Sequence, residues 1–131
     1  MQKDIDILGR TIFGEARGES TDGQIAVGHV VLNRYRSNKW FAGKTIADTC
    51  QKAFQFSCWN PSDPNCTLIM NAKERTLTPF WALADKIIRG EFADNTNGAT
   101  HYHTKSIKPK WARGKLPCAE IGNHVFYKNI D

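Results

Sequence analysis

The stretch of sequence that decides the fold lies at residues 21–36. It reads Thr21-Asp22-Gly23-Gln24-Ile25-Ala26-Val27-Gly28-His29-Val30-Val31-Leu32-Asn33-Arg34-Tyr35-Arg36. Thr21 and Gln24 stand at the spacing of a capping box, in which a hydroxyl and a side-chain amide pair with free backbone groups at a helix start. The apolar residues Ile25, Val27, Val30 and Val31 follow it. This pattern predicts a well-buried helix that reaches about Arg36.

A second helix is predicted just upstream, over residues 4–18. Ile5, Leu8 and Ile12 recur there at helical spacing, as residues do on the buried face of an amphipathic helix. Gly18 suits the end of this helix, because glycine commonly follows the last helical residue.

Three more helices are predicted downstream. They fall near residues 45–50, near residues 67–75 and from Thr78 onward. Thr78 is expected to cap the last of them, with Pro79 at its first position and Gly90 just past its end. Residues 55–66 are predicted as a loop, because proline, asparagine and aspartate are frequent there.

The pattern changes after Gly98, where short strands replace helices. The two predicted strands are His101-Tyr102-His103-Thr104 and His124-Val125-Phe126-Tyr127, and Gly122-Asn123 is a turn signal before the second. We find no internal repeat and no low-complexity segment. The chain is therefore predicted to form one domain over residues 1–131, of the α+β class but mainly α, with a small β-hairpin element near the C-terminus.

Composition narrows the class of protein further. The chain has 131 residues, of which 40% are hydrophobic and 24% charged, as is ordinary for a globular domain. Lysine and arginine exceed aspartate and glutamate by 18 − 13 = +5, which allows a polyanionic partner such as nucleic acid or bacterial cell wall. No apolar run approaches the roughly 18 residues that span a bilayer, so we expect no membrane insertion.

Glu15 and Glu19 are the first candidates for chemistry. Both fall near the end of the helix over residues 4–18, on one of its faces. Two like charges at this spacing are mildly destabilising, and a carboxylate at a helix C-terminus opposes the macrodipole. The arrangement therefore indicates a role such as general acid catalysis. The alternative is a solvated helix end with Arg17 beside it.

His101, His103 and His124 are the second candidates. His101 and His103 alternate along a predicted strand and so share a face, and His124 could join them in a zinc site. No ligand motif such as H-E-x-x-H supports that reading. Such histidines more often line a polar cleft or form hydrogen bonds inside a core, and we expect no metal.

Aromatic and amide side chains form the third candidate set, because they stack on sugar faces and bond to hydroxyl groups. The set comprises Trp40, Phe54, Gln55, Phe56, Trp59, Asn60, Trp81, Tyr102 and Trp111. Core packing is the alternative for some of them, and Trp59-Asn60 is the pair most expected to face a cleft. A basic stretch, Lys105 to Lys115, could track phosphates, but it carries no nucleic-acid motif.

Taken together, these pieces resemble the cell wall hydrolase family typified by the spore-cortex-lytic enzymes (SleB/CwlJ type). The matching stretches are Arg10 to Glu19, Gly23 to Val27 continuing to Val31-Leu32-Asn33-Arg34, Gln55 to Asn60, Gly98 to His103, and Ile121 to Tyr127. They cover nearly the whole chain, in the order and approximate spacing of the family.

The resemblance implies a compact lysozyme-like fold and activity on the glycan strands of peptidoglycan. Its essential acid maps to Glu15, and Glu19 also matches as a second catalytic candidate. We expect a lytic transglycosylase that cleaves the MurNAc–GlcNAc bond, giving 1,6-anhydro-MurNAc without a cofactor. The expected substrate-binding residues are Gln55, Phe56, Trp59, Asn60, Thr100, His101, Tyr102, His103 and Asn123.

Other classes of function stay open from the sequence. A muramidase would hydrolyse the same bond with Glu15 and a second carboxylate, and a non-catalytic wall-binding module would keep only the fold. A zinc amidase or a nucleic-acid binder is disfavoured. The four cysteines, Cys50, Cys58, Cys66 and Cys118, allow three disulfide pairings that sequence does not rank.

The N-terminus bears on where the protein acts. Met1-Gln2-Lys3-Asp4-Ile5-Asp6 lacks the apolar segment of a secretory signal. We expect a monomer made in the cytoplasm without a signal peptide, which acts on the wall like a phage endolysin, released by a holin-like partner.

Overall fold

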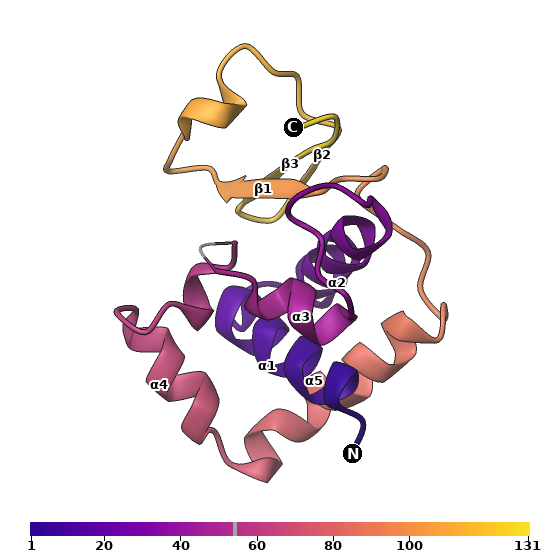
Figure 1. Ribbon diagram of the computed structural model, residues 1–131, viewed down its shortest axis with the longest axis vertical. Helices are drawn as coiled ribbons and strands as arrows, with labels where there is room; N and C mark the ends of the chain where they lie inside the picture. Colours follow the sequence, from indigo (N-terminus) through magenta and orange to yellow (C-terminus); the bar gives the residue numbers. More distant parts are fainter. Residues whose placement is uncertain (54) are drawn as a thin grey trace.

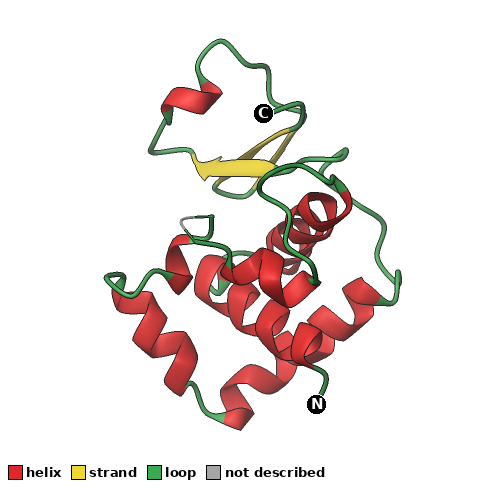
Figure 2. Cartoon of the chain, viewed as in Figure 1, coloured by secondary structure: helices red, strands yellow, loops and turns green. Residues whose placement is uncertain are grey.

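The computed structural model describes residues 1–53 and 55–131, so Phe54, one of the aromatic candidates, lies outside the described residues. The helices are α1 (Lys3–Ala16), α2 (Thr21–Arg36), α3 (Ile46–Gln51), α4 (Pro64–Asn71) and α5 (Glu74–Ile88), with single 3₁₀ turns η1 (Ser57–Trp59) and η2 (Lys110–Ala112). The strands are β1 (His101–Thr104), β2 (Ala119–Ile121) and β3 (His124–Tyr127). The helices form one body and the strands lie together beside it (Figures 1 and 2), which confirms the predicted α+β class, mainly α.

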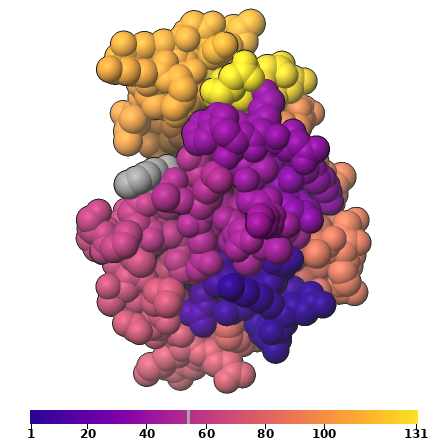
Figure 3. Space-filling model, in the orientation of Figure 1, coloured from indigo at the N-terminus to yellow at the C-terminus, as the bar shows by residue number. Residues whose placement is uncertain are grey.

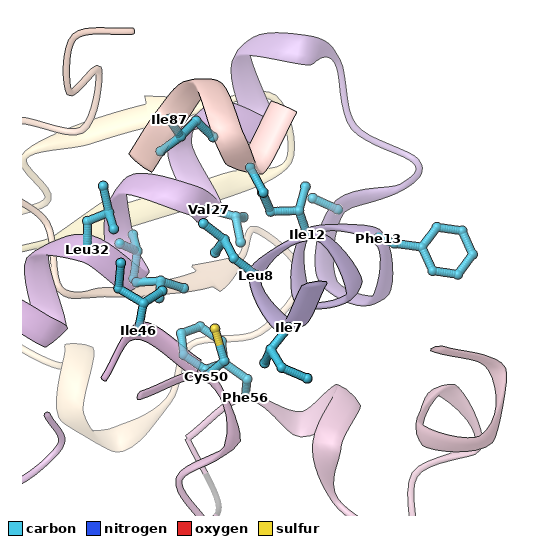
Figure 4. Packing of buried hydrophobic residues seen from close by; sticks show 14 of the residues in the cluster. Ile7, Leu8, Ile12, Phe13, Val27, Leu32, Ile46, Cys50, Phe56 and Ile87 are labelled. Carbon is cyan, nitrogen blue, oxygen red and sulfur yellow. The ribbon is translucent and has the colours of Figure 1, made fainter. Parts of the chain in front are cut away.

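Helix α1 is the centre of the helical body, because it packs against α2, α3, α4 and α5. Its Leu8 and Ile12 are fully buried and lie next to Val27 of α2 and Ile87 of α5 (Figure 4). Burial of a large aliphatic side chain stabilises a fold by about 1.5–3 kcal/mol. The helix that carries Glu15 is therefore held on several sides.

Several helix starts differ from the predicted ones by a few residues. Ser20 rather than Thr21 caps α2, since its hydroxyl accepts the N–H of Gly23 at 3.3 Å. Helix α4 begins at Pro64 with Asp63 as its cap, inside the segment that was predicted as a loop. A proline at the first helical position loses no hydrogen bond, so Pro64 favours an earlier start than the apolar spacing predicted.

The predicted start of α5 is wrong. The helix begins at Glu74, so Thr78 does not cap it and Pro79 lies inside it. Fully buried Leu77 extends the apolar face of the helix by one turn, and this burial favours the longer helix. Gly90 follows the end of α5 as predicted, with φ +79°.

The strands form one antiparallel sheet of three strands in the order β1-β3-β2. The two predicted strands are confirmed, and β3 pairs with both neighbours. Strand β2 was missed because three residues give no readable alternation. Gly122-Asn123 makes the tight turn of the β2–β3 hairpin, as predicted.

The segment between β1 and β2, residues 105–118, forms an arch over the sheet (Figure 1). A small second core of Ala112, Tyr127 and Ile130, against which Trp111 packs, holds it. Figure 3 shows the arch and the C-terminal segment stacked on the helical body. The predicted basic stretch lies on this arch, where its lysines and Arg113 are exposed.

Asp94 fixes the sheet to the helical body. Its carboxylate accepts from the side chain of Asn33 on α2 at 3.0 Å and from the N–H of Gly98 at 3.0 Å. Burial acts to raise the pKa of Asp94, but hydrogen bonds from Thr96, Asn33 and Gly98 outweigh it and lower the pKa. The residues that lead into β1 are thereby tied to α2.

No helix among the described residues is long and apolar enough to cross a membrane. Within the same residues the four cysteines are unpaired thiols. Cys50 and Cys58 are fully buried in the main core and act there as small apolar side chains.

Candidate active site

Glu15 lies in the last turn of α1 and is half-buried. The hydroxyl group of Tyr102, on β1, donates a hydrogen bond to its Oε1. The backbone N–H of Cys58, in η1, donates to its Oε2 at 3.3 Å. Two segments from distant parts of the sequence therefore orient this carboxyl group.

Gly14 lets η1 approach α1 closely enough for this contact. A Cβ at position 14 would lie 2.9 Å from Cβ of Cys58 and 2.9 Å from Cγ2 of Ile69, closer than packed carbon atoms approach. Gly14 therefore contributes to the site indirectly. It lets η1 pack close to α1, so that the N–H of Cys58 reaches the carboxyl group of Glu15.

Glu19 is bound to the turn of the β2–β3 hairpin. Its Oε1 accepts the backbone N–H of Asn123 at 3.0 Å, and its Oε2 accepts the side-chain Nδ2 of the same residue at 3.3 Å. Gly122, at φ +56°, fits directly against the carboxylate, since a Cβ there would lie 2.5 Å from Oε1 of Glu19. Glu19 thereby ties the α1–α2 connection to the sheet.

His124 lies beside Glu19 and is buried. Its Nδ1 is 3.9 Å from Oε1 of Glu19, and this atom has no hydrogen-bond partner among the described residues. Burial lowers the pKa of His124, although the charges of Glu19 and Glu15 act in the opposite direction. The imidazole next to Glu19 is therefore neutral near pH 7.

Glu15 and Glu19 both line one groove of about 380 Å³, with Thr104, Asn123 and His124 on its sheet side. Its walls come from the end of α1 on one side and from the sheet on the other. A larger hollow of about 600 Å³ lies by Leu116 and Lys128 and contains neither carboxylate. The groove is therefore the place where an acid can meet a ligand.

Comparison with known proteins shows the family of this chain. The family described as Cell Wall Hydrolase matches residues 18–127. The chain belongs to this family. Glu19 lies inside the matched residues, and Glu15 precedes them by three positions.

Curated relatives of this family member are spore cortex-lytic enzymes. The enzyme of Bacillus subtilis (strain 168) is 50% identical over 123 residues, which are 94% of this chain and 37% of the relative. The enzyme of Oceanobacillus iheyensis is 28% identical over 127 residues, or 97% of this chain and 42% of the relative. The chain spans about two-fifths of the length of these relatives.

Two solved structures of the family resemble the fold described above. The catalytic domain of the germination-specific lytic transglycosylase SleB from Bacillus anthracis superposes with a TM-score of 0.75 at 26% identity, covering 98% of this chain and 96% of that domain. The catalytic domain of Bacillus cereus SleB gives a TM-score of 0.76 at 24% identity, covering 98% and 91%. The second likeness shows the shared fold.

The other residues predicted to bind substrate differ in how far they are buried. Phe56 is buried under the guanidinium of Arg34, which lies 4.5 Å from its ring centroid. Trp59 donates its indole N–H to Thr11 at 2.9 Å and packs against the core. Phe56 is therefore committed to packing, whereas Trp59 and Asn60 are half-exposed.

Strand β1 reaches the groove through Thr104, and the predicted residues Thr100, His101 and His103 are not among the residues that line it. Oγ1 of Thr100 and Nδ1 of His101 share a hydrogen bond of 2.9 Å, and Nε2 of His103 is bonded to the Tyr127 hydroxyl at 2.9 Å. His101, His103 and His124 do not gather: the described part of the chain holds no cluster of three metal-ligating side chains.

A second hollow, of about 280 Å³, adjoins Tyr102 on β1. Arg34, Gln55, His101 and Trp111 also line it. Nη1 of Arg34 donates to Oε1 of Gln55 at 3.3 Å. Six predicted site residues therefore line one or the other of the two hollows: Glu15, Glu19 and Asn123 line the groove, and Gln55, His101 and Tyr102 line the second hollow.

Sequence reasoning missed three contributors to the site: Gly14, Gly122 and Arg34. Each had a signal: Gly14 is a glycine within a helical pattern, Gly122 belongs to a predicted turn, and Arg34 is an arginine in an apolar helix, which indicates a buried cation. The backbone N–H of Cys58 had no such signal in the sequence, because its place beside Glu15 depends on the path of the loop.

Proposed function

We propose that this chain cleaves the bond between MurNAc and GlcNAc in peptidoglycan as a lytic transglycosylase, with Glu15 as the general acid and base. The observation that carries the proposal is the Glu15 carboxyl group, which lines the groove and is oriented by Tyr102 and by the N–H of Cys58. The names of the curated relatives and of the similar Bacillus anthracis domain support the substrate and the reaction type.

The reaction needs one proton donor and one internal nucleophile. Glu15 gives its proton to the glycosidic oxygen, and the C1–O bond breaks as positive charge develops at C1 of MurNAc. The C6 hydroxyl of the same sugar then attacks C1, and the Glu15 carboxylate takes the hydroxyl proton. The products are a 1,6-anhydro-MurNAc end and a free GlcNAc end, and Glu15 is again protonated.

Tyr102 suits this cycle because a phenol hydroxyl both donates and accepts hydrogen bonds. Burial, followed by the nearby Glu15 charge, raises the pKa of Tyr102 well above its usual value. The phenol therefore keeps its proton, and it can face Glu15 in either of the two protonation states that the reaction uses.

The alternative is a muramidase, in which a second carboxylate positions water. Glu19 lies in the same groove and is the candidate for that role. Its hydrogen bonds come from N–H groups of Asn123, whereas Glu15 is bonded to the hydroxyl of Tyr102, which can accept as well as donate a hydrogen bond. This difference favours the mechanism in which Glu15 is the single acid.

The test is digestion of purified peptidoglycan, followed by mass spectrometry of the released muropeptides. We expect anhydro-MurNAc ends from the unaltered chain and none from Glu15→Gln, with Glu74→Gln, an exposed position at the start of α5, as the matched control. Reducing MurNAc ends would replace the proposal by the muramidase. Binding to the wall without any product would leave a non-catalytic wall-binding module.

A further inference from the structure

Arg34 is a buried cation without an anionic partner. Its side chain is almost fully buried, and no carboxylate of the described residues lies within ion-pair distance of it. A buried charge is costly unless it is paired and hydrogen-bonded. Burial lowers the pKa of Arg34 to about 10, although the nearby Tyr102 and the charge of Glu15 act in the opposite direction.

Neutral groups compensate this charge only in part. Nε of Arg34 donates to the backbone oxygen of Thr100 at 2.5 Å, and Nη1 donates to Oε1 of Gln55 at 3.3 Å. The guanidinium also faces the rings of Phe41 and Phe56, at 5.8 and 4.5 Å from their centroids. Carbonyl and amide oxygens carry no full charge, so an anionic or strongly polar acceptor would be bound favourably here.

Arg34 lines the hollow of about 280 Å³ next to Tyr102, and the hydroxyl of Tyr102 reaches the proposed acid Glu15. A ligand unit in this hollow therefore lies beside Tyr102, the residue that orients the proposed acid. Asp131, at the rim, already pairs with Lys39 at 2.6 Å and leaves the guanidinium to the ligand.

Indole rings provide the walls for a sugar. Trp111 reaches the hollow from the arch, and Trp40, which is 63% exposed, reaches it from beyond the end of α2. Aromatic rings of this kind combine a large apolar face with a polar edge. The volume is at the lower end of small-molecule pockets, so it suits one sugar unit rather than a longer strand.

We propose that this hollow binds the muramyl unit of the strand, and that Arg34 donates hydrogen bonds to the oxygens of its 3-O-lactyl group. The inference rests on the proposed function, because it names the sugar on which that site acts. GlcNAc lacks the lactyl group, so Arg34 is the residue that distinguishes peptidoglycan from chitin. In peptide-free strands the lactyl group ends in a free carboxylate, which supplies the anionic partner that Arg34 lacks.

The experiment measures binding without turnover, in the Glu15→Gln protein. Calorimetry compares a peptide-free GlcNAc–MurNAc tetrasaccharide with the GlcNAc tetramer of chitin. We expect at least about tenfold tighter binding of the muramyl ligand, as one charge-assisted hydrogen bond provides. Equal affinity for the two ligands would overturn the inference.

Gln55→Glu provides a variant that keeps Arg34 and the fold. The new carboxylate lies within reach of Nη1 of Arg34 and pairs with it inside the protein. We expect it to remove the preference for the muramyl ligand, whereas Gln2→Glu, an equal change of charge at the start of α1, keeps the preference.

Arg34→Met is expected to act like Gln55→Glu, and its melting temperature shows whether the variant is folded. A Gln55→Glu protein that keeps the preference would exclude Arg34 from lactyl recognition. Failure of the proposed function gives a different result. If the muramyl preference is present but peptidoglycan digestion gives no anhydro ends, the hollow binds the muramyl unit as inferred, and the reaction is not that of a lytic transglycosylase.

Discussion

Glu15 and Glu19 lie four residues apart at the same end of α1, and each of their oxygens receives one hydrogen bond. The donors differ. Both donors to Glu19 are N–H groups of Asn123, which cannot accept a proton in return. One donor to Glu15 is the hydroxyl of Tyr102, and a hydroxyl can accept a hydrogen bond as well as donate one. Protonation would cost Glu19 a hydrogen bond, whereas Glu15 can gain and lose a proton without losing Tyr102.

This comparison teaches that a carboxylate in a groove is suited to acid–base chemistry by the kind of partner it has. Glu19 has the surroundings of a structural clamp, and Glu15 has those of a group that changes protonation state.

The largest effect should come from removing the acid. Glu15→Gln is expected to lower the rate of anhydro-product formation by about a thousandfold, since a positioned general acid contributes roughly 10²- to 10⁴-fold. Glu19→Gln is expected to lower it by less than about tenfold. Turnover rates on soluble peptidoglycan fragments check both values, and losses of equal size would erase the contrast.

Removal of the hydroxyl that orients Glu15 should have the next largest effect. Tyr102→Phe is expected to reduce kcat by about 10- to 100-fold, with KM changed little, because the acid is misplaced while the groove is intact. Tyr35→Phe, at an exposed position of α2, is the control. A change confined to KM would show instead that Tyr102 only binds the sugar.

The contact between Glu19 and the β2–β3 turn should contribute to the free energy of unfolding. Gly122→Ala is expected to lower the free energy of unfolding by about 1–3 kcal/mol, because a Cβ would lie 2.5 Å from Oε1 of Glu19 and φ is +56°. In a Glu19→Ala background the same substitution should cost less, since the contact with the carboxylate is gone. Gly18→Ala, whose Cβ meets no atom within 4 Å, is the control in urea denaturation. A cost for Gly122→Ala that stays the same in both backgrounds would place Glu19 outside the clamp.

The smallest effect is expected in acid. Burial, with Arg34 and Lys39, lowers the pKa of His101 to about 4 from 6.5. The unfolded chain therefore binds a proton that the folded chain does not, and stability falls as pH falls from 6.5 to 4.

His101→Gln should reduce the fall in melting temperature over this range by roughly a few degrees. His124→Gln should reduce it less, because Glu19 and Glu15 oppose the effect of burial on His124. The reverse order of the two variants would contradict the assignment of His124 to the surroundings of Glu19.

Much of the fold was predictable because its signals are local. The apolar spacing in α1 and α2 and the Gly122-Asn123 turn each depend on neighbours in sequence. The start of α5 was not predictable from Pro79, since burial of Leu77 against the helical body outweighs the local preference. Strand β2 is defined only by its pairing with β3.

The same distinction applies to the site. Glu15 and Glu19 could be selected because their predicted position at a helix end violates local rules, although α1 ends at Ala16 and Glu19 lies in the connection to α2. The difference between the two glutamates could not be predicted from the sequence. It depends on their hydrogen bonds to Tyr102 and Asn123, which lie far along the chain. Trp59 was expected to face a cleft, but the structure places its indole N–H on Thr11.

The Glu15–Tyr102 contact spans 87 residues of chain, and the Glu19–Asn123 contact spans 104. During synthesis the acid on α1 emerges long before either partner. A ribosome-bound chain that ends before β1 has the helix and its carboxylate but no hydroxyl to orient it and no sheet to form the second wall of the groove. The proposed activity is therefore expected only once β1 and β3, residues 101–127, have been synthesised, and a product that ends before β1 has an incomplete groove.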